Sequence, residues 1–129
     1  MSAHAKAAGA AAYSLQNWSE AADKFSEAID APDVDVDELH KLYSNRCAAY
    51  MQLKKYKEAK DDAESCTQTK PVWAKGWSRL GECEDARGCY AEAALAFEKA
   101  IELDPSNAGY KSSKAGAEAK AKRAAAAAP

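Results

Sequence analysis

The sequence predicts an all-α fold built from stacked helix pairs, and three observations lead to this prediction. Val, Leu, Ile and Phe make up only 14 of the 129 residues, whereas Ala alone contributes 32. Strands favour the β-branched residues that this chain largely lacks, while small Ala side chains allow helices to approach each other closely. The chain also repeats itself, since Tyr56 and Ala59 recur at the same spacing as Tyr90 and Ala93, and each copy carries apolar residues at helical spacing.

Three copies of the repeat can be aligned. Two of them run from Lys41 to Pro71 and from Lys75 to Pro105, and each closes on a proline, which cannot continue a helix. The third copy lies upstream at a slightly larger offset, and its matching positions are Gly9, Trp18, Ala21, Phe25 and Ala28. We expect the four extra residues in the polar stretch 30–37, because a loop tolerates an insertion at little cost.

Each copy is predicted to form two helices joined by a short turn. In the last copy the helices are expected over 73–87 and 90–103, with Gly88 and Cys89 in the turn. Ala21, Ala59 and Ala93 occupy the same place in the three copies, where the two helices should cross most closely.

A seventh helix is expected after the last repeat. Ser106 is the predicted N-cap, and the helix should run through Tyr110 towards Lys122. Its many lysines provide the polar outer face that a capping helix at the end of a solenoid requires. The chain is thus interpreted as one domain over 2–123, with repeats at about 2–35, 40–73 and 74–107, a capping helix at about 108–123, and a low-complexity tail over 124–129.

Composition excludes several classes of function. A formal net charge of −2 excludes a protein that binds nucleic acid by bulk electrostatics. No apolar run approaches the roughly 18 residues that a membrane span needs. The four cysteines do not form a Cys-x-x-Cys pair, which favours free thiols in a reducing compartment and a cytoplasmic protein.

No catalytic or metal-binding pattern stands out. His4 and His40 have no Cys, Asp or Glu at ligand spacing on the same helix face, so no metal or other cofactor is expected. No Ser/His/Asp or Cys/His arrangement and no glycine-rich phosphate loop is found, so we expect neither an enzyme nor a small-molecule substrate.

The helix–turn–helix repeat, with its aromatic, Gly, Ala and Pro spacing, resembles the tetratricopeptide repeat (TPR) over nearly the whole chain. The resemblance implies a right-handed α-solenoid whose concave groove is lined by the first helix of each repeat and holds extended peptides.

Four polar residues of the three first helices are then candidates for contacting a ligand: Lys6, Asn45, Lys75 and Arg79. Lys75 and Arg79 are four residues apart and project from one helix face. Cations and an amide suit carboxylates, so an anionic ligand is indicated. The alternative at this stage is that these side chains are ordinary solvated surface.

The segment 42–50, followed by 75–79, resembles the co-chaperone class of these repeats, and 101–112 resembles the small glutamine-rich co-chaperones in particular. The chain also resembles the heat-shock organising protein. That class binds the acidic tail of heat shock protein 70 and 90 chaperones, which ends Glu-Glu-Val-Asp, through a five-residue clamp for two carboxylates. Lys6, Asn45, Lys75 and Arg79 match four clamp positions. The resemblance implies a protein–protein interaction module that acts as a co-chaperone adaptor.

The fifth clamp position departs from the class, because Ala10 stands where an Asn is expected. A hydrogen bond to a charged group contributes roughly 1.5–3 kcal/mol, so the affinity should fall about 10- to 150-fold. Three explanations stay open: a clamp disabled by replacement, a natural protein that binds weakly or grips a different tail, or a shifted alignment. Two rival functions also stay open, namely a scaffold that binds a partner through its convex face and a receptor for a different peptide.

Overall fold

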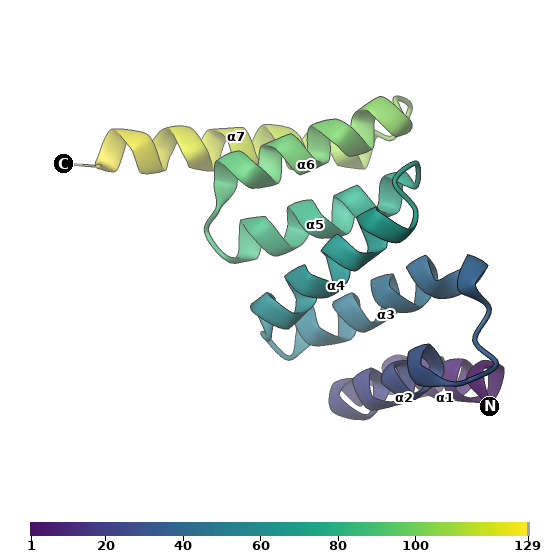
Figure 1. Ribbon diagram of the computed structural model, residues 1–129. Coiled ribbons are helices and arrows are strands. Elements are labelled where there is room, and N and C mark those ends of the chain that lie inside the picture. The colour runs from purple at the N-terminus through teal and green to yellow at the C-terminus, as the bar shows by residue number, and fades with distance from the viewer. Residues whose placement is uncertain (129) are drawn as a thin grey trace.

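The computed structural model describes residues 1–128, which form seven α-helices and one short 3-10 helix stacked in sequence order (Figure 1). The helices are α1 (Ser2–Ser14), α2 (Trp18–Asp30), η1 (Val36–Glu38), α3 (Leu39–Gln52), α4 (Tyr56–Thr69), α5 (Ala74–Ala86), α6 (Tyr90–Leu103) and α7 (Ala108–Ala127). No strand occurs in this part of the chain. Each α-helix packs against its neighbours in the sequence, which confirms the predicted all-α solenoid.

The helices of the last repeat follow the sequence prediction closely. α6 covers the predicted 90–103, and α5 is one residue shorter at each end than the predicted 73–87. The four extra residues of the first copy lie in the connection between α2 and α3, which includes η1.

The start of the seventh helix corrects the prediction. Asn107, not Ser106, is the N-cap, and its Oδ1 accepts a hydrogen bond from the backbone N–H of Tyr110 at 3.1 Å. The Ser106 hydroxyl donates instead to Asp104 at 3.1 Å. Asn and Ser are about equally good caps, so the sequence alone does not choose between the two neighbours.

The end of the seventh helix also lies beyond the expected Lys122. α7 continues to Ala127 through most of the low-complexity stretch, because alanine has the highest helix propensity of any residue. The last residue of that stretch, 129, lies outside the described residues.

The turn within each repeat passes through one residue in the left-handed region of φ. These residues are Gln16, Lys54 and Gly88, with φ of 63°, 60° and 80°. They occupy equivalent positions in the alignment of the three copies. The three helix pairs therefore turn in the same way, although only the last one uses glycine, the residue that adopts this conformation without a steric cost.

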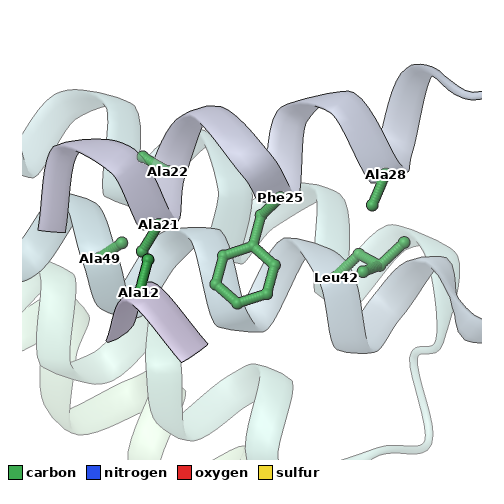
Figure 2. Close-up of a cluster of buried hydrophobic side chains, with 7 residues drawn as sticks. All are labelled: Ala12, Ala21, Ala22, Phe25, Ala28, Leu42 and Ala49. Carbon is green, nitrogen blue, oxygen red and sulfur yellow. The ribbon is translucent and has the colours of Figure 1, made fainter. Parts of the chain in front are cut away.

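The core is made of alanines around a few larger side chains. Ala21, Ala59 and Ala93 are fully buried, as predicted for the closest crossing point. In Figure 2 the ring of Phe25 points into a cluster of buried side chains contributed by α1, α2 and α3. A Cβ at Gly9 would lie 2.8 Å from that ring, so the close approach of α1 and α2 requires glycine there.

Arg46 connects the first two repeats, through an ion pair within the second repeat and a hydrogen bond to the first. Arg46 on α3 donates to both carboxylate oxygens of Asp62 on α4, at 2.9 and 2.7 Å, and its Nη1 donates to Ser26 of α2 at 3.0 Å. The hydrogen bonds to Asp62 raise the pKa of Arg46. Arg46 therefore serves the packing of the solenoid, whereas its neighbour Asn45 faces a pocket.

Candidate peptide-binding groove

The first helices of the three repeats share a pocket of about 260 Å³. Three residues selected from the sequence line it: Ala10 from α1, Asn45 from α3 and Arg79 from α5. The remaining lining residues are Tyr13, Ser14, Phe25 and Ala48. Residues far apart in the sequence thus meet where a single ligand can contact all three repeats.

Arg79 is held in place by two neighbours. Its Nε donates to the hydroxyl of Ser44 on α3 at 3.2 Å, and its Nη1 donates to Glu82, one turn along α5, at 3.2 Å. Within residues 1–128 its Nη2 has no hydrogen-bond partner. A guanidinium that is oriented by two contacts and keeps free N–H groups is well suited to bind a carboxylate.

Asn45 offers the second polar group of the pocket. Its side chain is half-buried, and its amide makes no hydrogen bond to any described side chain or backbone group. The apolar side chains of Phe25 and Ala48 line the same pocket, and a hydrogen bond to a ligand is stronger next to apolar surface than it is in water.

Lys6 and Lys75 do not line the pocket but stand one helical turn before two of its residues. Lys6 precedes Ala10 on α1, and Lys75 precedes Arg79 on α5, each by four residues. Neither lysine forms an ion pair with another of residues 1–128, whereas six other lysines do. The two free ammonium groups therefore add positive charge beside the pocket.

The positive charge of Lys6 acts on Glu38, at the start of the second repeat. The pKa of Glu38 lies below its ordinary value, chiefly because Lys41 donates a hydrogen bond to it, and the charge of Lys6 contributes to the same shift. The ammonium of Lys6 thus favours a nearby carboxylate.

Three groove residues escaped the sequence analysis. Tyr13 and Glu82 stand three residues after Ala10 and Arg79 respectively, so helical spacing alone could have revealed both. Ser44, in contrast, meets Arg79 on a different helix, across a separation in sequence that no local pattern reveals.

All four cysteines are free thiols, and Cys47, Cys66 and Cys83 are buried. Burial raises the pKa of Cys66 to about 12, and its thiol donates to the carbonyl of His40 at 3.3 Å. The sulfur of Cys83 lies 3.5 Å from that of Cys47, and this contact and burial together raise the pKa of Cys83. Since the thiolate is the nucleophile, Cys66 and Cys83 are poor candidates for catalysis.

Over residues 1–128, the His, Cys, Asp and Glu side chains form no group of three that could hold a metal ion. Over the same residues, no helix combines the length and the apolar character that crossing a membrane requires.

Comparison with known proteins identifies the family. Sequence profiles described as tetratricopeptide repeat match residues 40–72 and 74–107. The chain belongs to the tetratricopeptide repeat family. The first helix pair packs in the same way as the last one, since Gly9 meets Phe25 as Gly81 meets Phe97.

Among TPR proteins, the chain is 46% identical over 129 residues to the Hsp70-Hsp90 organizing protein of Triticum aestivum, covering 100% of this chain and 21% of that protein. It is 39% identical over 106 residues to the heat shock protein STI1 of Saccharomyces cerevisiae, covering 82% of this chain and 18% of that protein. The chain thus spans about a fifth of the length of these relatives. The predicted resemblance to this class is confirmed.

Solved structures of TPR domains have the same fold as this chain. The Sgt2 TPR domain from Aspergillus fumigatus superposes with a TM-score of 0.87 at 30% identity, covering 99% of this chain and 84% of that one. The first TPR of Spaghetti (RPAP3), solved with the HSP90 peptide SRMEEVD, superposes with a TM-score of 0.82 at 25% identity, covering 91% of this chain and 90% of that one.

Proposed function

We propose that this TPR domain is a co-chaperone adaptor that binds the acidic C-terminal tail of a heat shock protein 70 or 90 chaperone in the groove of α1, α3 and α5. One observation carries the proposal: Asn45 and Arg79 converge on one pocket, with the unpaired Lys6 and Lys75 one turn away from its lining. Four hydrogen-bond donors in a groove match a peptide that ends in two closely spaced carboxylates.

Each residue has a distinct role in this proposal. Lys6 and Asn45 hold one carboxylate of the terminal Asp. Lys75 and Arg79 hold the other carboxylate and the backbone of the tail. Arg79 is the best placed of the four, because Ser44 and Glu82 fix the direction of its guanidinium before the ligand arrives.

Relatives support this ligand. The RPAP3 domain was solved with a peptide that ends Glu-Glu-Val-Asp, and the Triticum aestivum relative carries both chaperone classes in its name. Solved TPR domains hold a peptide of either chaperone class, and both peptides end Glu-Glu-Val-Asp, so this shared ending defines the proposed ligand.

Ala10 makes the proposed binding weaker than that of a complete clamp. Ala10 lines the pocket together with Asn45 and Arg79, so an amide at this position would reach the same ligand. Its methyl group supplies no hydrogen bond, and the affinity should be about 10- to 150-fold below that of an Asn variant.

The proposed role is binding without catalysis, without a cofactor and without nucleic acid or membrane as partner. Four free thiols suit a reducing compartment, and we place the protein in the cytoplasm on that ground.

The test is titration calorimetry with a peptide ending Ile-Glu-Glu-Val-Asp, as the free acid and as the C-terminal amide. The amide keeps every side chain but loses the terminal carboxylate, so a clamp loses most of its affinity. We expect a saturable heat for the acid that disappears for the amide. Equal binding of both peptides would show that the groove holds an internal segment, and the proposal would be wrong.

A further inference from the structure

The groove face of α5 carries a carboxylate directly beside the proposed clamp. Glu82 lies three residues after Arg79 on α5, and its carboxylate accepts a hydrogen bond from Nη1 of Arg79 at 3.2 Å. The side chains of Arg79 and Glu82 are 24% and 43% exposed, so this ion pair lies at the surface of the groove. A ligand that reaches Arg79 therefore meets the negative charge of Glu82 as well.

The three copies of the repeat differ at this position. Glu82 corresponds to Ala10 in the first copy and to Ala48 in the second, and both alanines line the pocket. α1 and α3 contain no Asp or Glu at any position. The third copy thus places a charge where the first two copies present a methyl group.

The other two acidic residues of α5 are held by cations outside the proposed clamp. Glu84 is buried and pairs with Arg87 at 2.9 Å. Asp85 pairs with Lys120 on α7 at 2.8 Å. Among the acidic residues of α1, α3 and α5, Glu82 is therefore the one whose ion-pair partner, within residues 1–128, is also a proposed ligand-binding residue.

The charge of Glu82 also acts along the groove towards α7. Glu82 lines a hollow of about 530 Å³ between α5, α6 and α7. Burial is the main reason that the pKa of Tyr110, on α7, is raised. The charges of Asp104 and Glu82 raise the pKa of Tyr110 further, whereas Arg79 lowers it by less than either. Arg79 therefore does not cancel the negative charge of Glu82 in this part of the groove.

A bound tail would bring several carboxylates close to Glu82. A carboxylate on Arg79 shares one guanidinium with Glu82, and two like charges at such short range repel each other. An extended chain advances about 3.3–3.6 Å per residue, so a residue two positions upstream lies about 7 Å away. This separation is within the Debye length of about 8 Å at physiological salt. The repulsion thus acts on the terminal residue and on acidic residues just upstream of it.

We propose that Glu82 is a specificity-determining residue of the peptide groove. Its carboxylate shares Arg79 with the ligand and penalises each further carboxylate in the tail, so the groove distinguishes tails by the acidic residues that precede the terminal Asp. This inference rests on the proposed function, the binding of an acidic C-terminal tail. Ala10 and Glu82 then weaken that binding by different means, since Ala10 lacks a hydrogen-bond donor and Glu82 adds a negative charge.

The test compares two substitutions of Glu82 by titration calorimetry with a free-acid peptide ending Ile-Glu-Glu-Val-Asp. Glu82→Gln removes the charge but keeps an acceptor for Arg79, and it should bind the peptide about three- to tenfold more tightly than the parent. Glu82→Ala also frees Arg79 from one of its two contacts, so its gain should be smaller. Glu20→Gln, at an exposed site on α2 outside the pocket, changes the net charge equally and should bind like the parent.

A second peptide tests the discrimination between tails. A free-acid peptide ending Ile-Gln-Gln-Val-Asp keeps the terminal Asp and carries two fewer negative charges. Glu82→Gln should therefore strengthen the binding of this peptide less than that of the Glu-Glu peptide. Thermal melting of each variant checks that it is folded.

Three results would overturn the inference. The first is a Glu82→Gln variant that binds the Glu-Glu peptide no more tightly than the parent, which would leave Glu82 the role of orienting Arg79. The second is an equal gain from Glu20→Gln, and the third is an equal gain of Glu82→Gln for the two peptides.

The Ala10→Asn variant separates this inference from the proposed function. If Ala10→Asn binds the Glu-Glu peptide, the proposed function stands, and a failure of the Glu82 variants counts against Glu82 alone. If neither Ala10→Asn nor any Glu82 variant binds the peptide, the proposed function is wrong and the inference about Glu82 falls with it.

Discussion

The first and third repeats pack their helices around the same pair of residues, whereas the middle repeat uses a different one. Gly9 meets Phe25 and Gly81 meets Phe97, and in both places a Cβ on the glycine would overlap the ring. The equivalent residues of the middle repeat are Cys47 and Ala63, both fully buried. A larger residue on one helix is matched by a smaller one on the other, so the separation of the helices is preserved.

At two positions that face the groove, the first and third repeats carry different residues. Ala10 on α1 corresponds to Glu82 on α5, and Lys6 corresponds to Ser78. Positions that pack the solenoid thus recur along the chain, because every repeat must solve the same packing problem. Positions that line the pocket also recur, since Arg79 stands one repeat length after Asn45, but the residue types at them are free to differ because they do not pack the solenoid.

Changing Arg79 should give the largest effect on binding with little effect on the fold. Arg79→Ala removes an oriented, charge-assisted contact, so the affinity for a peptide ending Ile-Glu-Glu-Val-Asp should fall about 10- to 150-fold. Arg123→Ala, which changes an exposed arginine on α7, is the matched control and should bind like the parent. Calorimetry measures both, and equal affinities of the two variants would remove Arg79 from the site.

Changing Gly81 should have the opposite effect, lowering stability and leaving the binding residues in place. A Cβ at this position would lie 2.6 Å from Phe97, so Gly81→Ala should lower the free energy of unfolding by about 1–3 kcal/mol. Gly9→Ala should cost a similar amount if the two repeats are packed equivalently. A denaturant titration of each variant gives the values.

Gly116 on α7 provides the control for helix propensity. A Cβ there meets nothing within 4 Å, so Gly116→Ala should stabilise the protein by up to about 1 kcal/mol. If Gly81→Ala were stabilising as well, the packing argument would be wrong.

The smallest effect is expected at the start of α3, where the repeats differ again. His40 occupies the position of Ser2 in the first repeat and Ala74 in the third. Burial, together with the charges of Lys70 and Lys41, lowers the pKa of His40. The unfolded chain therefore takes up this proton at a higher pH than the folded chain does.

Neutral His40 makes its full contribution to the free energy of unfolding above the ordinary histidine pKa of about 6.5. This contribution decreases as the pH falls below that value. His40→Gln should flatten this part of the stability profile measured by thermal melting between about pH 7 and pH 5. An unchanged slope would mean that another group titrates there.

Most of the fold could be predicted because the packing positions recur. The alanines at 21, 59 and 93 and the regular spacing of the copies define the helix pairs, and the structure agrees. The N-cap of α7 was missed because two adjacent residues, Ser106 and Asn107, are both good caps.

The site could be predicted only in part. Asn45 and Arg79 were found through the family resemblance and do share a pocket with Ala10. The contact of Ser44 with Arg79 depends on how α3 lies against α5, and that geometry is not a property of any short segment.

The central claim is that the groove of α1, α3 and α5 grips a free C-terminal carboxylate, with Ala10 as its weakened position. Calorimetric titration of a peptide ending Ile-Glu-Glu-Val-Asp into the parent chain and into Ala10→Asn tests it most directly. The account predicts that the variant binds about 10- to 150-fold more tightly than the parent. Equal affinities, or no binding by either protein, would contradict the assignment of the groove and direct attention to the convex face.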